Sequence, residues 1–99
     1  MTLAQFIVDY VRKHRSVTFG EVQEAGRDAG YTMHGRLELA CGKAYLWSCM
    51  SPEFAVAVHN LVSSRQVRIV RTTRLDCLVS SPRILISEQP WIPCRLEAS

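Results

Sequence analysis

Residues 51–72 read SPEFAVAVHNLVSSRQVRIVRT, and along them a helical pattern changes into a strand pattern. Ser51 can cap a helix, Pro52 suits the first helical position, and Glu53 is an acid in the first turn. Apolar residues then follow at helical spacing: Phe54, Val58, Leu61 and Val62. Beyond two serines the apolar period becomes two. This stretch therefore predicts a helix that leads into a β-strand at residues 67–72.

The residues after this strand predict a hairpin. Residues 75–79 form a second β-type run, and a turn of Thr73 and Arg74 separates it from the first. Residues 84–86 (Ile-Leu-Ile) are a candidate for a further strand. Residues 90–93 (Pro-Trp-Ile-Pro) are too rich in proline for a central strand, so we expect an extended segment that packs across the domain.

Two helices are predicted before this region. The first has a one-sided apolar stripe at helical period, with Thr2 as its cap: Leu3, Phe6, Ile7, Tyr10 and Val11. Its last turn is basic (Arg12, Lys13, His14 and Arg15), which suits the negative end of the helix dipole. The second helix is predicted from the capping-box spacing of Thr18 and Glu21, with Val17 and Val22 as a hydrophobic staple. Gly30 is a suitable left-handed cap for its end.

Residues 31–50 allow two interpretations. Leu37, Leu39 and Cys41 alternate with less apolar residues, which favours a half-buried strand but is also compatible with a short helix. Gly42 and Lys43 have the composition of a turn, and residues 45–49 are typical of a buried strand. If residues 33–43 were helical, residues 51–66 would become a fourth helix and the candidate recognition helix would change.

The order helix, helix, ambiguous element, helix, hairpin resembles the winged-helix variant of the helix-turn-helix. The expected fold is a small α+β, winged-helix-like domain over residues 1–99, with three helices followed by a C-terminal β-hairpin, the wing. Residues 46–54 (LWSCMSPEF), 71–73 (RTT) and 91–93 (WIP) are similar to segments of small proteins from phages and prophages. That resemblance implies a phage or prophage setting and implies no mechanism.

The composition indicates a soluble globular chain. Of its 99 residues, 47% are apolar and 21% are charged, which excludes a disordered or low-complexity chain. No apolar run has the roughly 18–20 residues that a membrane span needs, and no signal peptide precedes the first helix, so we expect a cytoplasmic protein without a membrane partner. The net charge of +3 excludes an acidic mimic of DNA and is lower than that of an obligate nucleic-acid binder.

No pattern in the sequence indicates catalysis, a metal or a cofactor. There is no paired-carboxylate motif, no glycine-rich phosphate loop and no serine or cysteine nucleophile in a recognisable setting, so we expect no enzyme activity. The four cysteines lack the closely spaced pairs of zinc sites: Cys41, Cys49, Cys77 and Cys94. We expect them to be free thiols that pack as small apolar residues.

On a winged helix, the helix before the hairpin would enter the major groove and the hairpin would contact the backbone or the minor groove. The candidate DNA-binding residues are Asn60, Ser63, Arg65, Gln66, Arg68, Arg71 and Arg74. The amide and hydroxyl groups can hydrogen-bond base edges, and the arginines of the wing can contact phosphates. Strand alternation would place Arg68 and Arg74 on one face and Arg71 on the other. Because the helix carries few cations, this face would need a homodimer or residues 12–15 to complete its phosphate contacts.

Two functions follow from these observations. The first is a small DNA-binding protein, a transcriptional regulator of phage or prophage origin that binds double-stranded DNA. The alternative is a protein–protein interaction module without catalytic activity, such as a phage-encoded inhibitor of a host defence complex. The modest net charge and the apolar character of residues 51–63 favour the alternative.

Overall fold

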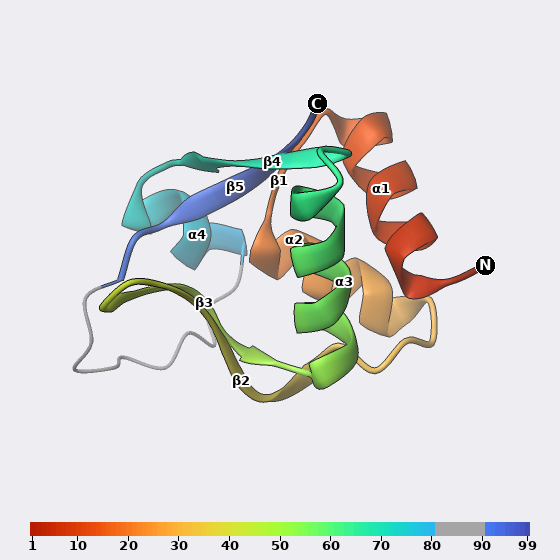
Figure 1. The fold of residues 1–99 in the computed structure, drawn as a ribbon, viewed down its shortest axis with the longest axis horizontal. Helices are drawn as coiled ribbons and strands as arrows, with labels where there is room; N and C mark the ends of the chain where they lie inside the picture. Colours follow the sequence, from red (N-terminus) through yellow and green to blue (C-terminus); the bar gives the residue numbers. More distant parts are fainter. Residues whose placement is uncertain (81–90) are drawn as a thin grey trace.

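Figure 1 shows a computed structural model of the chain, which describes the backbone of residues 1–80 and 91–99 and the side chains of residues 1–77 and 91–99. The helices and strands follow one another as α1 (Leu3–His14), β1 (Ser16–Thr18), α2 (Phe19–Asp28), β2 (His34–Cys41), β3 (Ala44–Met50), α3 (Pro52–Ser63), β4 (Val67–Arg71), α4 (Arg74–Ser80) and β5 (Cys94–Ala98). The chain is thus a small α+β fold.

The strands form two antiparallel sheets. The three-stranded sheet has the order β1–β5–β4, so the last strand of the chain is the central one. Its register places Val17 and Ile69 on either side of Leu96. The second sheet is the hairpin β2–β3. In Figure 1 the three-stranded sheet lies along the top and the hairpin at the lower left, and α3 runs from the hairpin up to the sheet.

One apolar core joins the helices to both sheets. Its largest fully buried side chains are Phe19, Phe54, Ile7, Met33, Met50 and Leu96. Trp47 of the hairpin is also buried and stacks on Phe19 of α2, with 6.1 Å between ring centroids. Among the described residues, no helix combines the length and the apolar character that a membrane span requires.

The predicted helix caps are confirmed. The hydroxyl groups of Thr2, Thr18 and Ser51 each accept a hydrogen bond from the backbone N–H three residues later, at 3.0–3.2 Å. Gly30 has a φ of 95°, and the hydrogen bonds from the N–H of Gly30 to Arg27 O and from the N–H of Tyr31 to Gly26 O form a Schellman motif. The capping residues in the sequence therefore predicted these helix ends correctly.

The region that allowed two interpretations is a hairpin, and the helical interpretation of residues 33–43 is wrong. Gly42 has a φ of 63° in the turn between β2 and β3, as the composition predicted. In β3, Tyr45 and Trp47 are buried. β2 is more exposed than expected: Leu37 is 44% exposed, and Leu39 is the one half-buried residue of the strand.

A buried glutamine attaches this hairpin to α2. The Gln23 side chain donates to Met33 O at 3.1 Å and to Cys49 O at 2.8 Å, and its carbonyl accepts from Trp47 Nε1 at 3.1 Å. The Gln23 residue is 3% exposed. Both N–H groups and the carbonyl oxygen of the amide are thus used to hold the hairpin against the helical body.

The predicted wing hairpin is wrong in its second half, because residues 75–79 lie in α4. Thr73 caps this helix: its hydroxyl accepts from the N–H of Asp76 at 3.2 Å, and its carbonyl accepts from the N–H of Cys77 at 3.4 Å. The apolar residues at 75, 78 and 79 fit a helical spacing as well as a strand, so periodicity alone could not separate them. The described residues therefore form four helices, and α4 follows β4 where the second strand of the wing was expected.

The partner of β4 is β5, a strand that the sequence did not predict. Before β5, Trp91 and Ile92 cross the hairpin β2–β3 in extended form, as predicted for residues 90–93. Trp91 Nε1 donates to Leu46 O at 3.2 Å, and the N–H of Ile92 donates to Tyr45 O at 3.0 Å. Pro90 and the strand predicted at residues 84–86 lie outside the described residues.

Candidate nucleic-acid interface

The seven candidate DNA-binding residues are all exposed, but they do not form one surface. Five of them follow a continuous path from the last turns of α3, through the turn, into the start of β4: Asn60, Ser63, Arg65, Gln66 and Arg68. Arg71 ends β4 and Arg74 begins α4, so both lie at the far end of a strand that is roughly 13 Å long. The structure therefore brings five of the seven candidate residues together and places Arg71 and Arg74 away from them.

The expectation about alternating faces is correct only for the residues of β4. Arg68 pairs with Glu97 of β5 and Arg71 pairs with Cys94, three positions apart and hence on opposite faces of the strand. Arg74 shares no strand face with Arg68, because it belongs to α4. Arg68 is also engaged: its guanidinium lies 3.0 Å from the Glu97 carboxylate.

The exposed surface of α3 is poor in positive charge. Neither lysine nor arginine occurs between Pro52 and Ser63, and Glu53 adds a negative charge to the first turn. Val56 is 57% exposed at the middle of this surface. The amide of Asn60 and the hydroxyl of Ser63 are the groups that can hydrogen-bond a base edge, and cations flank them only at the C-terminal end of the helix.

The turn between α3 and β4 holds Arg65 in a left-handed conformation. A Schellman motif closes the helix, with hydrogen bonds from the N–H of Arg65 to Val62 O at 3.1 Å and from the N–H of Gln66 to Leu61 O at 3.0 Å. Arg65 occupies the position that glycine usually takes, with a φ of 61°. Its side chain is directed into solvent at the end of the molecule.

The basic last turn of α1 lies at this same end. The C-terminal ends of α1 and α3 and the end of β5 are together at the top of Figure 1. Two hydrogen bonds define the arrangement: the N–H of Ala98 donates to Arg15 O at 3.2 Å, and the N–H of Ser99 donates to Gln66 O at 3.4 Å. The basic run was visible in the sequence, but only the position of β5 reveals that it adjoins the α3–β4 turn.

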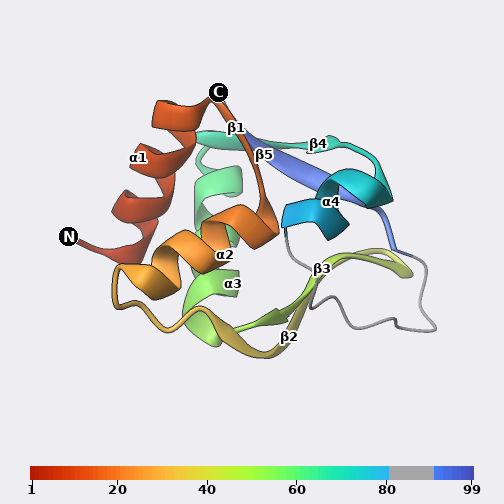
Figure 2. The same cartoon turned by 180° about the vertical axis from the view of Figure 1, so that it is seen from behind.

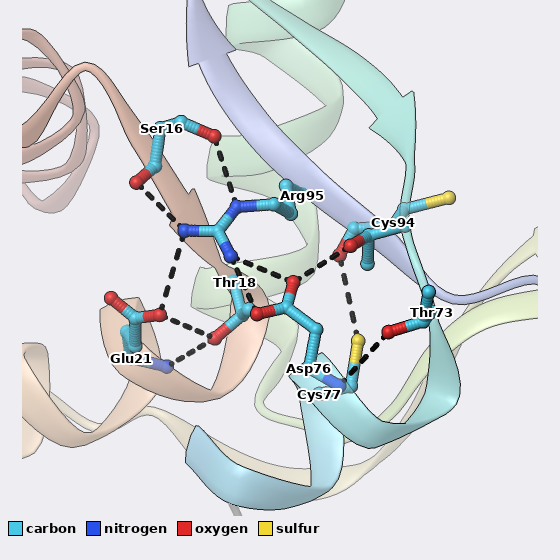
Figure 3. A network of polar contacts seen from close by, with 9 residues as sticks. Ser16, Thr18, Glu21, Thr73, Asp76, Cys77, Cys94 and Arg95 are labelled. Atoms are coloured by element: carbon cyan, nitrogen blue, oxygen red, sulfur yellow. Dashed lines mark hydrogen bonds and ion pairs between the residues drawn. The ribbon is translucent and has the colours of Figure 1, made fainter.

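A polar network centred on Arg95 holds α4 against the three-stranded sheet (Figure 3). The guanidinium donates to both carboxylate oxygens of Asp76 at 2.7 Å, and to the hydroxyl and carbonyl of Ser16 at 2.9 and 3.0 Å. Glu21 of α2 lies 3.8 Å away. Seen from behind, α4 lies beside α2 (Figure 2), and the two helices are in contact. The network is internally satisfied, so we interpret it as structural.

The charges in this network shift two pKa values. Burial acts to raise the pKa of Asp76, but hydrogen bonds from Arg95 and Thr72 and the charge of Arg95 outweigh it, so the pKa lies below its ordinary value. The hydrogen bond to Asp76 is the main reason that the pKa of Arg95 lies above its ordinary value. Both effects favour the ion pair at neutral pH.

All four cysteines are free thiols. Cys77 and Cys94 are buried, and burial raises the pKa of the Cys77 thiol to about 11 and that of Cys94 above its ordinary value. Cys41 is exposed on the hairpin. In the part of the chain that the structure describes, no three histidine, cysteine or acidic side chains gather in a way that could hold a metal ion.

Two hollows mark the surface of α3. One, of about 200 Å³, is apolar and lies between α3, the hairpin and β4; its lining includes Leu39, Leu46, Val58, Val62 and Ile69. The other is shallower, and Val56, Asn60 and Ala4 are among the residues that line it. No family model, curated protein or solved structure matches this chain.

Proposed function

We propose that this chain is a winged-helix domain that binds double-stranded DNA, and that it acts as a regulator in a phage or prophage. The observation that carries the proposal is the order of the elements. Helix, strand, helix, helix, strand, strand is the order of a winged helix. The elements α1, β1, α2, α3, β4 and β5 follow this order, with β5 between β1 and β4 in the sheet, when the hairpin β2–β3 and the helix α4 are treated as insertions. The hairpin then lies before the third helix, and α4 lies between the last two strands.

The position of α3 supports the proposal. In a winged helix the helix before the second strand is the recognition helix, and α3 leads into β4 through a turn of three residues. Asn60 and Ser63 are exposed near its end, where they can hydrogen-bond base edges. Arg65 and Arg68 follow, and they would contact the backbone. Arg71 lies at the end of β4 and Arg74 at the start of α4, where a wing would follow the second strand, and both would contact the backbone there.

Binding to a random 20-base-pair duplex tests this function. Fluorescence anisotropy at about 50 and 200 mM salt should show affinity that falls steeply with salt. The variant Arg68→Ala/Arg71→Ala/Arg74→Ala should reduce the salt slope by about 2.7 if all three arginines contact phosphates, because each contact contributes about 0.9. The matched control is Arg27→Ala/Arg36→Ala/Lys43→Ala, which removes the same charge elsewhere. Absence of duplex binding at 50 mM salt would refute the proposal.

The surface of α3 favours a second candidate, a module that binds a host protein complex. Glu53 and the exposed Val56 are unusual for a helix that enters the negatively charged major groove. Val56→Arg separates the two functions. If α3 docks on a protein, this variant should abolish capture of that protein, whereas an added cation should leave duplex affinity unchanged or raise it.

A further inference from the structure

Four cations gather at the end of the molecule where α1 and α3 stop. Arg12, Lys13 and Arg15 come from the end of α1, and Arg65 from the turn after α3; we call these four residues the basic end. Arg15 and Gln66 are hydrogen-bonded to the last two residues of the chain, one on each side of β5. Because neighbouring strands lie about 4.8 Å apart, the two backbones lie roughly 10 Å from each other.

The cations of the basic end make no ion pair with another described residue. None of the four has a described carboxylate within ion-pair distance, whereas Arg27, Arg68 and Arg95 have at least one each. Arg36, Lys43, Arg71 and Arg74 are likewise unpaired among the described residues, so it is the gathering of four such cations that distinguishes the basic end. Free cations at helix ends are stabilised by the helix dipole, and this accounts for part of the pattern. It does not account for two sequence-distant groups that meet across β5 without an acidic partner.

The backbone gives a second, independent observation. Three residues other than glycine have a positive φ in the described part, and two of them are arginines of the basic end: Arg15 at 68° and Arg65 at 61°. Glycine adopts such angles without steric cost, whereas a side chain at Cβ is strained there. Strained residues that persist tend to occur at functional sites. The chain thus places arginine at two positions where glycine would give a more stable fold.

The chemistry of the basic end fits a chain of phosphates. Three of its four cations are arginines, whose planar forks match phosphate oxygens. The backbones that carry the two groups lie roughly 10 Å apart, which is comparable to about three base-pair steps of 3.4 Å along the axis of a DNA duplex. The large apolar side chains that are exposed in the described part (Met1, Leu37, Val56 and Leu75) belong to other surfaces, so nothing here would insert into a lipid bilayer.

We propose that the basic end is a phosphate-backbone clamp for double-stranded DNA, formed by Arg12, Lys13, Arg15 and Arg65. This inference rests on the proposed DNA-binding function and adds Arg12, Lys13 and Arg15 to the backbone contact already proposed for Arg65. The clamp adjoins the end of α3 where Asn60 and Ser63 are exposed, so one duplex can reach both. It supplies the phosphate contacts that the surface of α3 lacks.

The salt dependence of duplex binding tests the clamp. Four phosphate contacts contribute about −3.6 to the slope, which is a factor of about 150 in the affinity lost between 50 and 200 mM salt. Arg12→Gln/Arg65→Gln removes two of these contacts, so the slope should become shallower by about 1.8 and the affinity lost between the two salt concentrations should shrink by a factor of about 12. The control Arg36→Gln/Lys43→Gln changes the net charge equally on the hairpin and should retain the wild-type slope.

The variant Arg65→Gly distinguishes a role of Arg65 in DNA binding from a purely structural role. Arg65→Gly relieves the left-handed strain, so Tm should rise by roughly 4 °C, while the salt slope becomes shallower by about 0.9. A merely structural arginine would show no change in DNA binding. A fall in both Tm and affinity would also contradict the argument, because it would mean that the side chain stabilises the fold.

The outcomes distinguish this inference from the proposed function. If the basic-end variant keeps the wild-type slope while Arg68→Ala/Arg71→Ala/Arg74→Ala loses binding, the clamp is refuted and the DNA-binding function stands. If no duplex binds but vesicles with 30% anionic lipid do, and the basic-end variant abolishes this, the partner is a membrane and both proposals fail. If neither duplex nor vesicles bind, both proposals fail as well.

Discussion

Gln23 offers the sharpest test of how the hairpin β2–β3 is attached to the rest of the fold. Gln23→Ala removes three hydrogen bonds to Met33, Trp47 and Cys49. Met33 O keeps the bond from the N–H of Ser51 at 3.1 Å, and Cys49 is half-buried, so water can replace the amide there. The indole N–H of Trp47 is left without its partner inside the core.

The cost follows from these contacts. Each lost hydrogen bond contributes about 1 kcal/mol, so the variant should lose about 3 kcal/mol of the free energy of unfolding. For a chain of this size that corresponds to a fall of roughly 12–24 °C in Tm. Urea denaturation followed by Trp47 and Trp91 fluorescence measures the difference. In the Trp47→Phe background the cost of Gln23→Ala should shrink by about 1 kcal/mol, because the orphaned donor is already gone.

The matched control is Gln5→Ala on the exposed surface of α1. The Gln5 amide donates to Asp9 Oδ1 at 2.8 Å, so this variant also loses a glutamine hydrogen bond, but in water. Its cost should stay below about 0.5 kcal/mol. If Gln23→Ala costs no more than Gln5→Ala, the hairpin is not held by the buried amide and the reasoning is refuted.

Three further predictions concern α4, the thiols and the hairpin. The pKa of Asp76 is lowered in the folded state, so its ion pair with Arg95 should stabilise the protein above the unfolded pKa and lose that effect as the pH falls through the folded pKa. Asp76→Asn should lower the free energy of unfolding by about 1–2 kcal/mol at pH 7 and make it depend less on pH between about pH 5 and 2. If the free energy of unfolding of the variant fell with acid as steeply as that of the wild type, this prediction would be contradicted. The exposed Cys41 should react with a thiol reagent at pH 8 within seconds. Cys77 is fully buried and its pKa is raised to about 11, so it should react only as fast as the protein unfolds. Equal reaction rates of the two thiols would show that Cys77 is not buried. A Cβ at Gly35 would lie 2.7 Å from a backbone carbonyl at the end of β3, so Gly35→Ala should lower the free energy of unfolding by about 1–3 kcal/mol, and a neutral result in urea denaturation would contradict the close approach.

Local signals predicted the helical part of the fold well. Thr2, Thr18 and Ser51 cap helices as expected, because an N-cap is a contact between residues three apart and can be recognised without the rest of the chain. The turn at Gly42 is equally local. These features depend on the side chain and its immediate neighbours, and tertiary structure did not override them.

The sheet could not be predicted in the same way. The partner of β4 was expected to be the next apolar run, but that run is α4 and the true partner is β5, more than twenty residues later. A capping contact from Thr73 to Asp76 is the local signal that the strand interpretation overlooked. β5 has only five residues, with Arg95 and Glu97 in alternation, and its central place depends on long-range pairing that no local pattern encodes.

The same difference between local and long-range features applies to the candidate site. Asn60, Ser63 and Arg65 were found because they lie on one helix and its turn. In the sequence, the helix dipole suffices to explain the cations of α1, and only the fold brings Arg15 across β5 from Gln66. Sites assembled from distant segments need the topology, whereas single-helix sites do not.

Chemical-shift mapping with a 12-base-pair duplex at 50 mM salt tests the central claim most directly. On ¹⁵N-labelled protein, we expect the largest amide shifts at residues 12–16 and 60–68, the ends of α1 and α3 and the start of β4. Shifts confined to the hairpin at residues 34–50, or no shifts at a tenfold excess of duplex, would contradict DNA binding through this end of the molecule.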